Sequence, residues 1–269
     1  MRIATWNINS VRTRAERALT LLDSHDIDVL CLQETKVADD KFPTQVFEDA
    51  GYHVARHGLN QWNGVAIISK QAPEETYQGF PGQPGFAKDP DKDQAPEARA
   101  LGVVIRGVEI WSLYFPNGRG ITDRHYDYKL QFYYALARYV EQRSHRKLLL
   151  TGDFNVAPRD EDVWDLSVFR GKTHVTEPER AAFQMLLEAG TQEVTRQFTR
   201  EERWTYFDYK GMRFQKGEGM RIDFQLASQP LVERVRSAAV DIAERAEKGT
   251  SDHVLLMADY DLPDFDAVR

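Results

Sequence analysis

Two apolar, strand-like runs near the start of the chain enclose a segment with helical spacing. The runs are residues 1–7 and 29–33. Between them, apolar residues recur at the intervals of a helix with one buried face: Ala15, Ala18, Leu19 and Leu22. Thr13, followed three residues later by Glu16, is typical of a capping box, so we expect the helix to begin there. A strand–helix–strand unit places its two strands side by side and parallel, which makes an α/β fold the first expectation.

Polar residues mark the ends of these runs. Asn7 ends the first run and Glu34 follows the second, so we expect an amide and a carboxylate at one end of the sheet. Other polar residues at the boundaries of apolar runs are Asp153, Asn155, Asp252 and His253. Mg²⁺ prefers oxygen ligands and keeps several waters, so one or two carboxylates make a sufficient protein site. We therefore predict that Glu34 and Asp252 bind Mg²⁺, although either carboxylate alone is more often a surface cap.

The tetrapeptide 152–155, Gly-Asp-Phe-Asn, follows the apolar run 148–151. Asp153 and Asn155 are two residues apart, which in a strand puts both side chains on one face. Asp153 can then position and deprotonate an attacking water, while the Asn155 amide holds that water or a phosphate oxygen. The alternative is a simple turn, since Gly, Asp and Asn all favour one.

His253 is the histidine with a catalytic context. Asp223 lies in the apolar segment 222–227 and can orient the imidazole, so that the imidazolium stabilises negative charge developing on a phosphate. Tyr114 ends the run 109–114 and would present its hydroxyl at the same sheet edge. A core tyrosine with a satisfied hydroxyl is an equally good reading of that position.

The remaining pattern predicts two strand-rich halves. Strand-like runs cover residues 52–57, 65–69, 101–105, 109–114, 148–151, 222–227, 235–242 and 254–260. Helical patterns cover 123–143 and begin again at Thr176, where Glu179 completes a capping box. The Gly- and Pro-rich stretch 79–96 is typical of a long surface loop. Because both halves supply polar residues, we predict a four-layer α/β sandwich with two mixed β-sheets packed face to face and helices on the outer faces.

Composition limits the class of protein. The 269 residues are 42% hydrophobic, so we expect one domain spanning 1–269, with two domains as the alternative. Apolar runs are too short for a membrane span, and Cys31 is the only cysteine, so we expect a cytoplasmic protein. The net charge of −7 opposes nucleic-acid binding overall, but basic and aromatic residues alternate within 196–221. That stretch could grip a DNA backbone, and a solvated loop is the alternative.

With these residues identified, the chain resembles the exonuclease III family of apurinic/apyrimidinic endonucleases, within the deoxyribonuclease I-like phosphodiesterase superfamily. The resemblance runs nearly from end to end. The motifs that carry it, in chain order, occupy residues 5–12, 32–36, 62–66, 113–118, 152–155, 219–223 and 251–253. Most are common individually, but in this order they are specific.

The resemblance implies hydrolysis 5′ to an abasic site in duplex DNA, with 3′→5′ exonuclease and 3′-end-cleaning activity, by a monomer associated with the nucleoid. It implies one or two ions, Mg²⁺ with Mn²⁺ as a substitute. The metal ligands it implies are Glu34, Asp252 and Asn7, with Asp153 and Asn155 beside a second ion. The catalytic residues it implies are Asp153, Asn155, His253, Asp223 and Tyr114. The DNA contacts it implies are Asn9, Arg12, Asn117, Arg119, Tyr206, Met220 and Arg221.

Two alternatives stay open at this stage. The superfamily includes inositol-phosphate phosphatases and sphingomyelinases, which share the Glu, Gly-Asp-x-Asn and Ser-Asp-His elements. The Trp-Asn-x-Asn-Ser-x-Arg start at 6–12 and the Tyr-x-Pro-Asn-Gly segment at 114–118 favour DNA. A catalytically silent DNA-binding protein is the second alternative, and it would have lost at least one ligand or base. Every position that matches the family's motifs holds a chemically competent residue.

Overall fold

The computed structural model describes residues 1–262, so the last seven residues of the predicted domain lie outside the described residues. Within that range, the strands form two six-stranded sheets. The first has the order β11-β12-β1-β2-β4-β3. Its strands are β1 (Arg2–Asn7), β2 (Val29–Gln33), β3 (His53–His57), β4 (Val65–Ser69), β11 (Val235–Asp241) and β12 (Leu255–Tyr260). β1 and β2 are parallel, as the strand–helix–strand pattern predicts.

The second sheet has the order β5-β6-β7-β8-β10-β9. Its strands are β5 (Glu75–Gln78), β6 (Ala100–Ile105), β7 (Val108–Tyr114), β8 (Leu148–Asp153), β9 (Thr191–Glu193) and β10 (Asp223–Ser228). β7 and β8 are parallel, and β10 runs antiparallel to β8. The short edge strands β5 and β9 were not predicted, because each has too few apolar residues to give a pattern.

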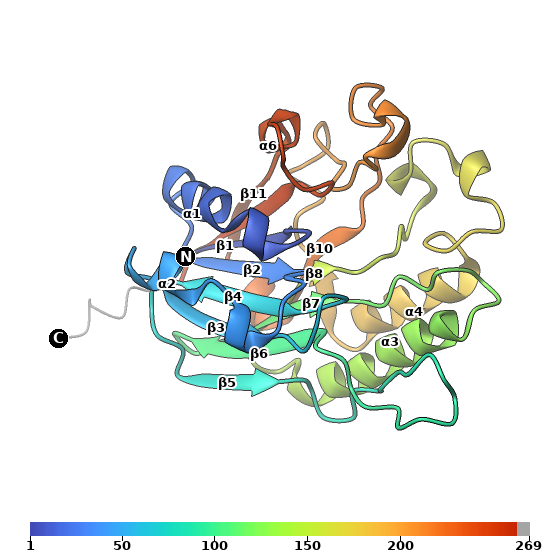
Figure 1. Ribbon diagram of the computed structural model, residues 1–269, viewed down its shortest axis with the longest axis horizontal. Coiled ribbons are helices and arrows are strands. Elements are labelled where there is room, and N and C mark those ends of the chain that lie inside the picture. The colour runs from blue at the N-terminus through green and yellow to red at the C-terminus, as the bar shows by residue number, and fades with distance from the viewer. Residues whose placement is uncertain (263–269) are drawn as a thin grey trace.

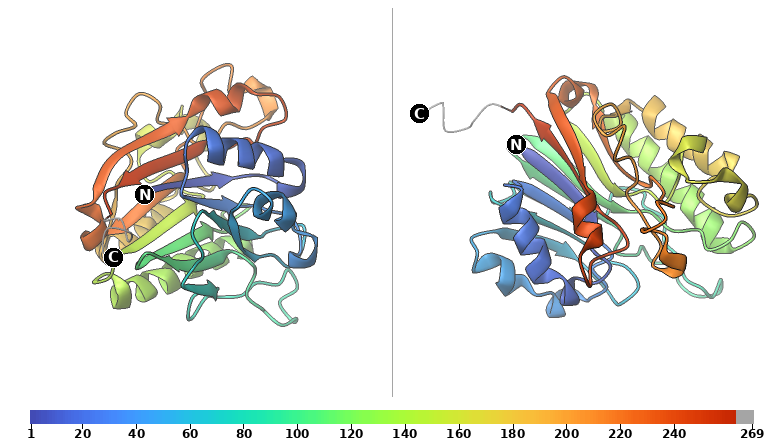
Figure 2. Two further views of the ribbon diagram at one scale, coloured as in Figure 1. Left: turned by 90° about the vertical axis from the view of Figure 1, so that its left-hand side faces the viewer. Right: turned by 90° about the horizontal axis from the view of Figure 1, so that it is seen from above.

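The two sheets pack face to face with helices outside, so the four-layer prediction is confirmed (Figure 1). Ile3 and Val29 from the first sheet meet Val103 and Leu149 from the second in one apolar layer. Seen from above, helices flank both sheets on their outer sides (Figure 2). Across residues 1–262, no helix combines the length and apolar character needed to cross a bilayer.

Within residues 1–262, all three predicted helices form, together with three short helices that were not predicted. The helices are α1 (Ala15–Ser24), α2 (Thr44–Glu48), α3 (Arg124–Arg143), α4 (Glu177–Glu188), α5 (Gln229–Val232) and α6 (Ile242–Ala246). Short 3₁₀ turns occupy Val11–Thr13, Asp39–Lys41, Asp160–Asp162, Leu166–Phe169 and Lys210–Met212. The capping box of Thr176 and Glu179 is confirmed at α4. The one predicted at Thr13 is wrong, because Thr13 belongs to the 3₁₀ turn and its hydroxyl donates to Ser10 O instead.

The strand ends converge at one end of the sandwich. Asn7 ends β1, Tyr114 ends β7 and Asp153 ends β8. Asp223 begins β10 directly opposite Asp153, because β10 is antiparallel to β8. His253 precedes β12, which is antiparallel to β1. Topology alone therefore brings polar side chains from both sheets together.

Candidate active site

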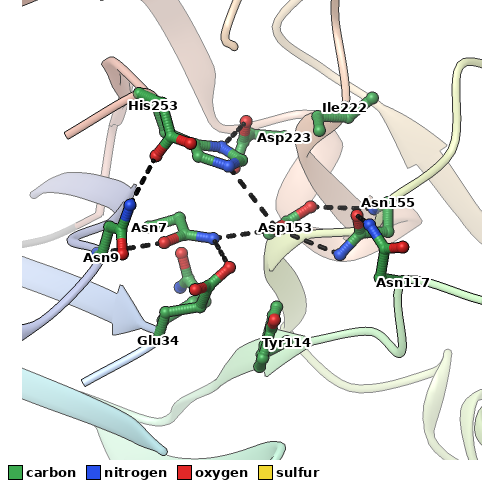
Figure 3. A network of polar contacts seen from close by, with 12 residues as sticks. Asn7, Asn9, Glu34, Tyr114, Asn117, Asp153, Asn155, Ile222, Asp223 and His253 are labelled. Carbon is green, nitrogen blue, oxygen red and sulfur yellow. Dashed lines mark hydrogen bonds and ion pairs between the residues drawn. The ribbon is translucent and has the colours of Figure 1, made fainter. Parts of the chain in front are cut away.

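Asn7 joins the two sheets at the centre of the site. Its buried Nδ2 donates to Glu34 Oε1 at 2.8 Å and to Asp153 Oδ2 at 3.0 Å. Figure 3 shows the amide between the two carboxylates. In the parallel register of β1 and β2, Asn7 lies opposite Gln33, the last residue of β2. Glu34 is the next residue along the chain, so it lies beside Asn7. One amide thus fixes the spacing of two carboxylates from different sheets.

His253 is held as a cation between two carboxylates. Its Nδ1 lies 2.9 Å from Asp223 Oδ2, and its Nε2 lies 3.8 Å from Asp153 Oδ2. Burial lowers the pKa of His253, but the charges of Asp223 and Asp153 outweigh burial and raise it to about 10. At neutral pH the ring is therefore an imidazolium whose Nε2–H points toward the site.

Asp153 is a buried carboxylate at the centre of the site. Burial raises its pKa, with a further increase from the charges of Asp223 and Glu34, while His253 and the Asn7 hydrogen bond lower it. A carboxylate whose pKa is raised above its usual range can accept a proton from water at neutral pH more readily than an ordinary aspartate. The environment of Asp153 thus suits a general base.

Asn155 reaches Asp153 through a turn. β8 ends at Asp153, and Asn155 adopts a left-handed conformation with φ 52°. The Asn155 backbone N–H donates to Asp153 Oδ1 at 2.9 Å, and its Nδ2 donates to Asp153 Oδ2 at 3.1 Å and to Phe115 O at 3.0 Å. The prediction that both side chains share one face of a strand is therefore wrong, and the turn alternative is the correct local structure. The two groups still lie together.

Glu34 and Asp252 are linked by a second polar chain. Lys36 Nζ lies 2.7 Å from Glu34 Oε2 and donates to Asn9 Oδ1 at 2.6 Å. Asn9 Nδ2 donates to Asp252 Oδ1 at 3.0 Å. Burial raises the pKa of Glu34, but the Lys36 charge and hydrogen bonds from Asn7 and Lys36 outweigh burial and lower it. Glu34 is therefore ionised at neutral pH.

The donor set suits a hard divalent cation. One ligand atom from each of Glu34, Asp153 and His253 lies within 4.8 Å of the others. Of these, the two carboxylates offer the oxygen donors that a hard cation prefers, whereas an imidazolium paired with Asp223 has no lone pair to offer. Asp252 lines the same cleft and adds a third carboxylate. Oxygen-only coordination of this kind fits Mg²⁺ or Mn²⁺ better than a soft metal.

These groups lie in a cleft of about 560 Å³. Its lining includes Glu34, Asn117, Arg119, Asp153, Asn155, Trp164, Phe169, His174, Tyr206, Arg213, Met220, Asp252 and His253. The Tyr206 ring stands 4.9 Å from the His253 ring, measured between centroids. The cleft therefore combines an acidic floor with aromatic and cationic walls, which suits a substrate that carries both a phosphate and a flat or apolar group.

Comparison with known proteins agrees with this geometry. Residues 4–253 match the model of the Endonuclease/Exonuclease/phosphatase family. The chain belongs to this family. Exodeoxyribonuclease III of Haemophilus influenzae is 31% identical over 271 residues, covering 97% of this chain and 100% of that protein. The resemblance to exonuclease III-type enzymes is confirmed, as is the prediction of a nuclease-type hydrolase.

Two solved structures of family members are similar to the chain over 97% of its length. A 3′ phosphatase, NExo, from Neisseria, bound to a product DNA hairpin, is 35% identical with a TM-score of 0.90. An AP endonuclease from Archaeoglobus fulgidus is 34% identical with a TM-score of 0.89. The chain covers 100% of each of these structures.

The structure also shows where the residues lie that the family resemblance implies as DNA contacts. Asn117 and Arg119 lie exposed on the loop after β7 and line the cleft. The Arg119 guanidinium lies 5.7 Å from the Phe86 ring, so the 79–96 loop supports it. Tyr206 is half-buried beside His253, whereas Met220 is only 6% exposed at the cleft wall. Arg12 is exposed on the 3₁₀ turn Val11–Thr13, and it is not among the residues that line the cleft.

Arg221 does not lie at the surface, so its prediction as a DNA contact is wrong. Its side chain is fully buried and donates to Thr199 Oγ1 at 2.8 Å and to Thr195 Oγ1 at 2.7 Å. A further contact joins its Nη2 to Glu193 Oε1 at 3.4 Å. The guanidinium anchors the 193–205 segment behind the site. The sequence pattern misleads here because a basic residue inside a basic stretch looks solvent-exposed.

Tyr114 is buried at the end of β7, under the guanidinium of Arg99, which lies 4.7 Å from its ring. Burial raises the pKa of Tyr114 well above its ordinary value, and the charges of Glu34 and Asp153 raise it further. The hydroxyl is therefore a proton donor and not a phenolate at neutral pH. Figure 3 shows Tyr114 beside Glu34 and Asp153.

His174 is a site residue that sequence reasoning missed. Its Nε2 lies 3.0 Å from Asn155 Oδ1, which also accepts from Asn117 Nδ2 at 3.2 Å. Burial lowers the pKa of His174, so the ring is neutral and Nε2 must carry the proton that Asn155 accepts. Nδ1 then accepts from Thr173 Oγ1 at 2.8 Å. The only signal was its position two residues before the helix cap Thr176.

A buried ion pair supports this wall of the cleft. Lys129 Nζ pairs with Glu179 Oε1 at 2.5 Å, with both side chains fully buried. Lys129 also donates to Asn155 O at 2.6 Å, and Glu179 accepts from the His174 backbone N–H at 2.9 Å. α3 therefore supports the Asn155 turn directly through Lys129, and α4 supports it through the contact of Glu179 with His174.

Proposed function

We propose that this protein is a DNA-repair phosphodiesterase that cleaves duplex DNA 5′ to abasic sites and processes blocked 3′ ends, using Mg²⁺ or Mn²⁺. The observation that carries the proposal is the convergence of Asn7, Glu34, Asp153 and His253 from both sheets on one cleft. Family membership and the names of the relatives support DNA as the substrate. We further propose that the protein acts as a monomer in the cytoplasm, where it would meet the nucleoid.

The residues present would divide the chemistry among them. Glu34 and Asp252 would hold the cation, with Asn7 keeping the Glu34 carboxylate in place. The cation, when bound, supplies Lewis-acid polarisation of a phosphate oxygen. Asp153 would take the proton from the attacking water, which its raised pKa favours. A second ion would bind beside Asp153 and Asn155, and the metal titration described below tests for it.

Charge on the phosphate would be stabilised from two sides. The Nε2–H of His253 faces the site as part of a cation, because Asp223 holds Nδ1 at 2.9 Å. The Asn155 amide is fixed by four partners, Asp153, His174, Phe115 and Asn117. Fixed donors aimed at developing charge lower a barrier without reorganisation during the reaction. The neutral Tyr114 hydroxyl would assist at the same phosphate.

The walls of the cleft would bind the DNA. Arg119 and Asn117 on the cleft wall, together with Asn9 and Arg12 outside the cleft lining, would contact backbone phosphates, which gives affinity without sequence preference. Tyr206 and Met220 would contact the sugar of the lesion, because they add flat and apolar surface next to His253. Arg221 has no part in this surface.

An end-labelled duplex with a single abasic site tests the proposal directly. We expect a nick on the 5′ side of the lesion that requires Mg²⁺ or Mn²⁺ and disappears in chelator. A metal titration in the same assay reports whether one ion or two are needed. A parallel duplex with a 3′-terminal phosphate measures end processing, since one similar structure is named a 3′ phosphatase and another an AP endonuclease. Turnover of inositol phosphates or sphingomyelin, with both duplexes left intact, would reject DNA as the substrate.

A further inference from the structure

The Lys36 ammonium lies among the groups that we assign to the metal. Its Nζ contacts Glu34 Oε2 at 2.7 Å and Asn9 Oδ1 at 2.6 Å. Asn9 passes the connection on by donating to Asp252 Oδ1 at 3.0 Å. Through Asn9, a single ammonium therefore joins the two carboxylates that are the first choices for the cation.

The backbone of Lys36 is fixed in a way that a mobile surface lysine would not need. Lys36 has φ 54° and Glu34 has φ 53°, both in the left-handed region that side chains other than glycine rarely adopt. The Lys36 N–H donates to Asn63 O at 2.9 Å, and the Thr35 N–H donates to Gly64 O at 3.1 Å. Strained conformations persist where surrounding contacts determine them, and they are concentrated at functional sites.

We propose that Lys36 is an internal cation that competes with the divalent metal for Glu34 and pairs with a substrate phosphate once it is displaced. The proposal rests on the metal site of the proposed function. An ammonium at 2.7 Å satisfies the Glu34 carboxylate, and a divalent cation on the same carboxylate would repel it. The Lys36 side chain is 31% exposed, so the displaced ammonium has an open path to a phosphate.

This exchange would couple metal and DNA binding. When a metal binds without DNA, it must displace the Lys36 ammonium from Glu34, and the ammonium then has no new partner. A metal that enters with DNA bound releases the ammonium to a phosphate, so each ligand improves the affinity for the other. The protein would then load its metal most tightly when the substrate is in place.

Mn²⁺ binding to the metal-free full-length protein, measured without DNA by the electron paramagnetic resonance signal of free Mn²⁺, tests the competition. We expect Lys36→Met to bind Mn²⁺ about ten-fold more tightly than wild type, because one positive charge beside the site is gone. Lys36→Gln, which removes the charge but keeps a polar end, should behave in the same way. Lys36→Arg keeps the charge and should stay within about two-fold of wild type.

Lys70→Met is the matched control. Lys70 is also a partly exposed lysine paired with a carboxylate, Asp28 at 3.1 Å, and it does not line the cleft. Its Mn²⁺ affinity should equal that of wild type. Unchanged or weaker binding by Lys36→Met and Lys36→Gln would overturn the competition, as would an equal gain in Lys70→Met. If wild type itself bound no Mn²⁺, the metal-dependent function would fail, which is a separate result.

The phosphate half of the proposal has its own measurement. A duplex with phosphorothioate linkages, which resists cleavage, is added to the same Mn²⁺ titrations. We expect the duplex to tighten Mn²⁺ binding in wild type and to do so several-fold less in Lys36→Met. An equal effect of the duplex on both proteins would mean that the Lys36 ammonium does not move to a phosphate.

Discussion

The floor and the walls of the cleft are built in different ways. The floor consists of residues at strand ends, and strand register sets their spacing: Asn7 lies opposite Gln33 in the β1–β2 pair, and Asp153 lies opposite Asp223 in the β8–β10 pair. The walls come from loops that follow the strands. Their residues include Asn117, Arg119, Trp164, His174 and Tyr206.

This difference separates two kinds of support. A floor residue is placed by backbone hydrogen bonds of the sheets, so changing its side chain alters chemistry more than position. A wall residue is placed by other side chains, such as the buried Lys129–Glu179 pair under the Asn155 turn or the Arg221 guanidinium behind the 193–205 segment. Substitutions in the walls should therefore act either through folding or through DNA contact, and seldom through the chemical step.

The largest effect should come from the floor. Asp153→Asn keeps the shape of the side chain and removes the proton acceptor, so we expect nicking of abasic duplex to fall at least about 10³-fold. DNA affinity should change by less than about three-fold, because the backbone position is set by β8 and β10. Asp160→Asn, at an aspartate on the 3₁₀ turn Asp160–Asp162 that does not line the cleft, is the control. Full activity in Asp153→Asn would show that the base lies elsewhere.

The second largest effect should appear in the pH dependence of stability. Without metal, the folded-state pKa of His253 is about 10, raised from an ordinary value of 6.5 by Asp223 and Asp153. The attraction of the imidazolium to these carboxylates therefore stabilises the folded protein fully below pH 6.5. This contribution is lost as the pH rises toward 10 and the imidazolium loses its proton. The free energy of unfolding of wild type relative to His253→Gln should therefore fall by about 3 kcal/mol across that window.

Urea denaturation in chelator at several pH values measures this difference. The exposed His145→Gln is the matched control, since His145 lies on the surface between α3 and β8. Its difference from wild type should stay flat with pH. If the His253→Gln difference were also flat between pH 6.5 and 10, the imidazole would not be held as a cation by the floor carboxylates.

The same division explains how much the sequence could predict. The floor residues could be predicted from the sequence because apolar runs mark strands. A strand–helix–strand unit places Asn7 and Glu34 at one end of the sheet without further information. The four-layer fold followed from the same patterns. The left-handed turn that carries Asn155 was not accessible from strand periodicity, because periodicity assumes that the strand continues.

The wall residues were harder to predict from the sequence, because their positions depend on contacts between segments that are distant in the chain. His174 has no motif of its own and is placed by Glu179 and Asn155. Arg221 looked like a DNA contact because local charge cannot show that Thr195 and Thr199 fold back over it. The resemblance to a family supplied Asn117, Arg119 and Tyr206, which residue patterns alone would not have singled out.

Arg221 offers a third test, now of support within the walls. Arg221→Met removes a buried guanidinium that donates to two threonine hydroxyls, so we expect a loss of about 2 kcal/mol in the free energy of unfolding. Urea denaturation measures it, with the exposed Arg200→Met as a control that should stay within about 0.5 kcal/mol of wild type. DNA affinity of the folded Arg221→Met protein should stay near wild type. A large loss of DNA affinity with an unchanged free energy of unfolding would mean that Arg221 contacts DNA after all.

The smallest effect should come from Arg119, the wall residue that is exposed and lines the cleft. Arg119→Ala should weaken binding of abasic duplex by about five- to ten-fold, with no change in the free energy of unfolding beyond about 0.5 kcal/mol. Because one phosphate contact is lost, the slope of log affinity against log salt should become shallower by about 0.9. Arg138→Ala, at an exposed arginine on α3 away from the cleft, should leave both the affinity and the slope unchanged. Equal salt slopes in Arg119→Ala and wild type would place the phosphate-binding face somewhere other than this wall.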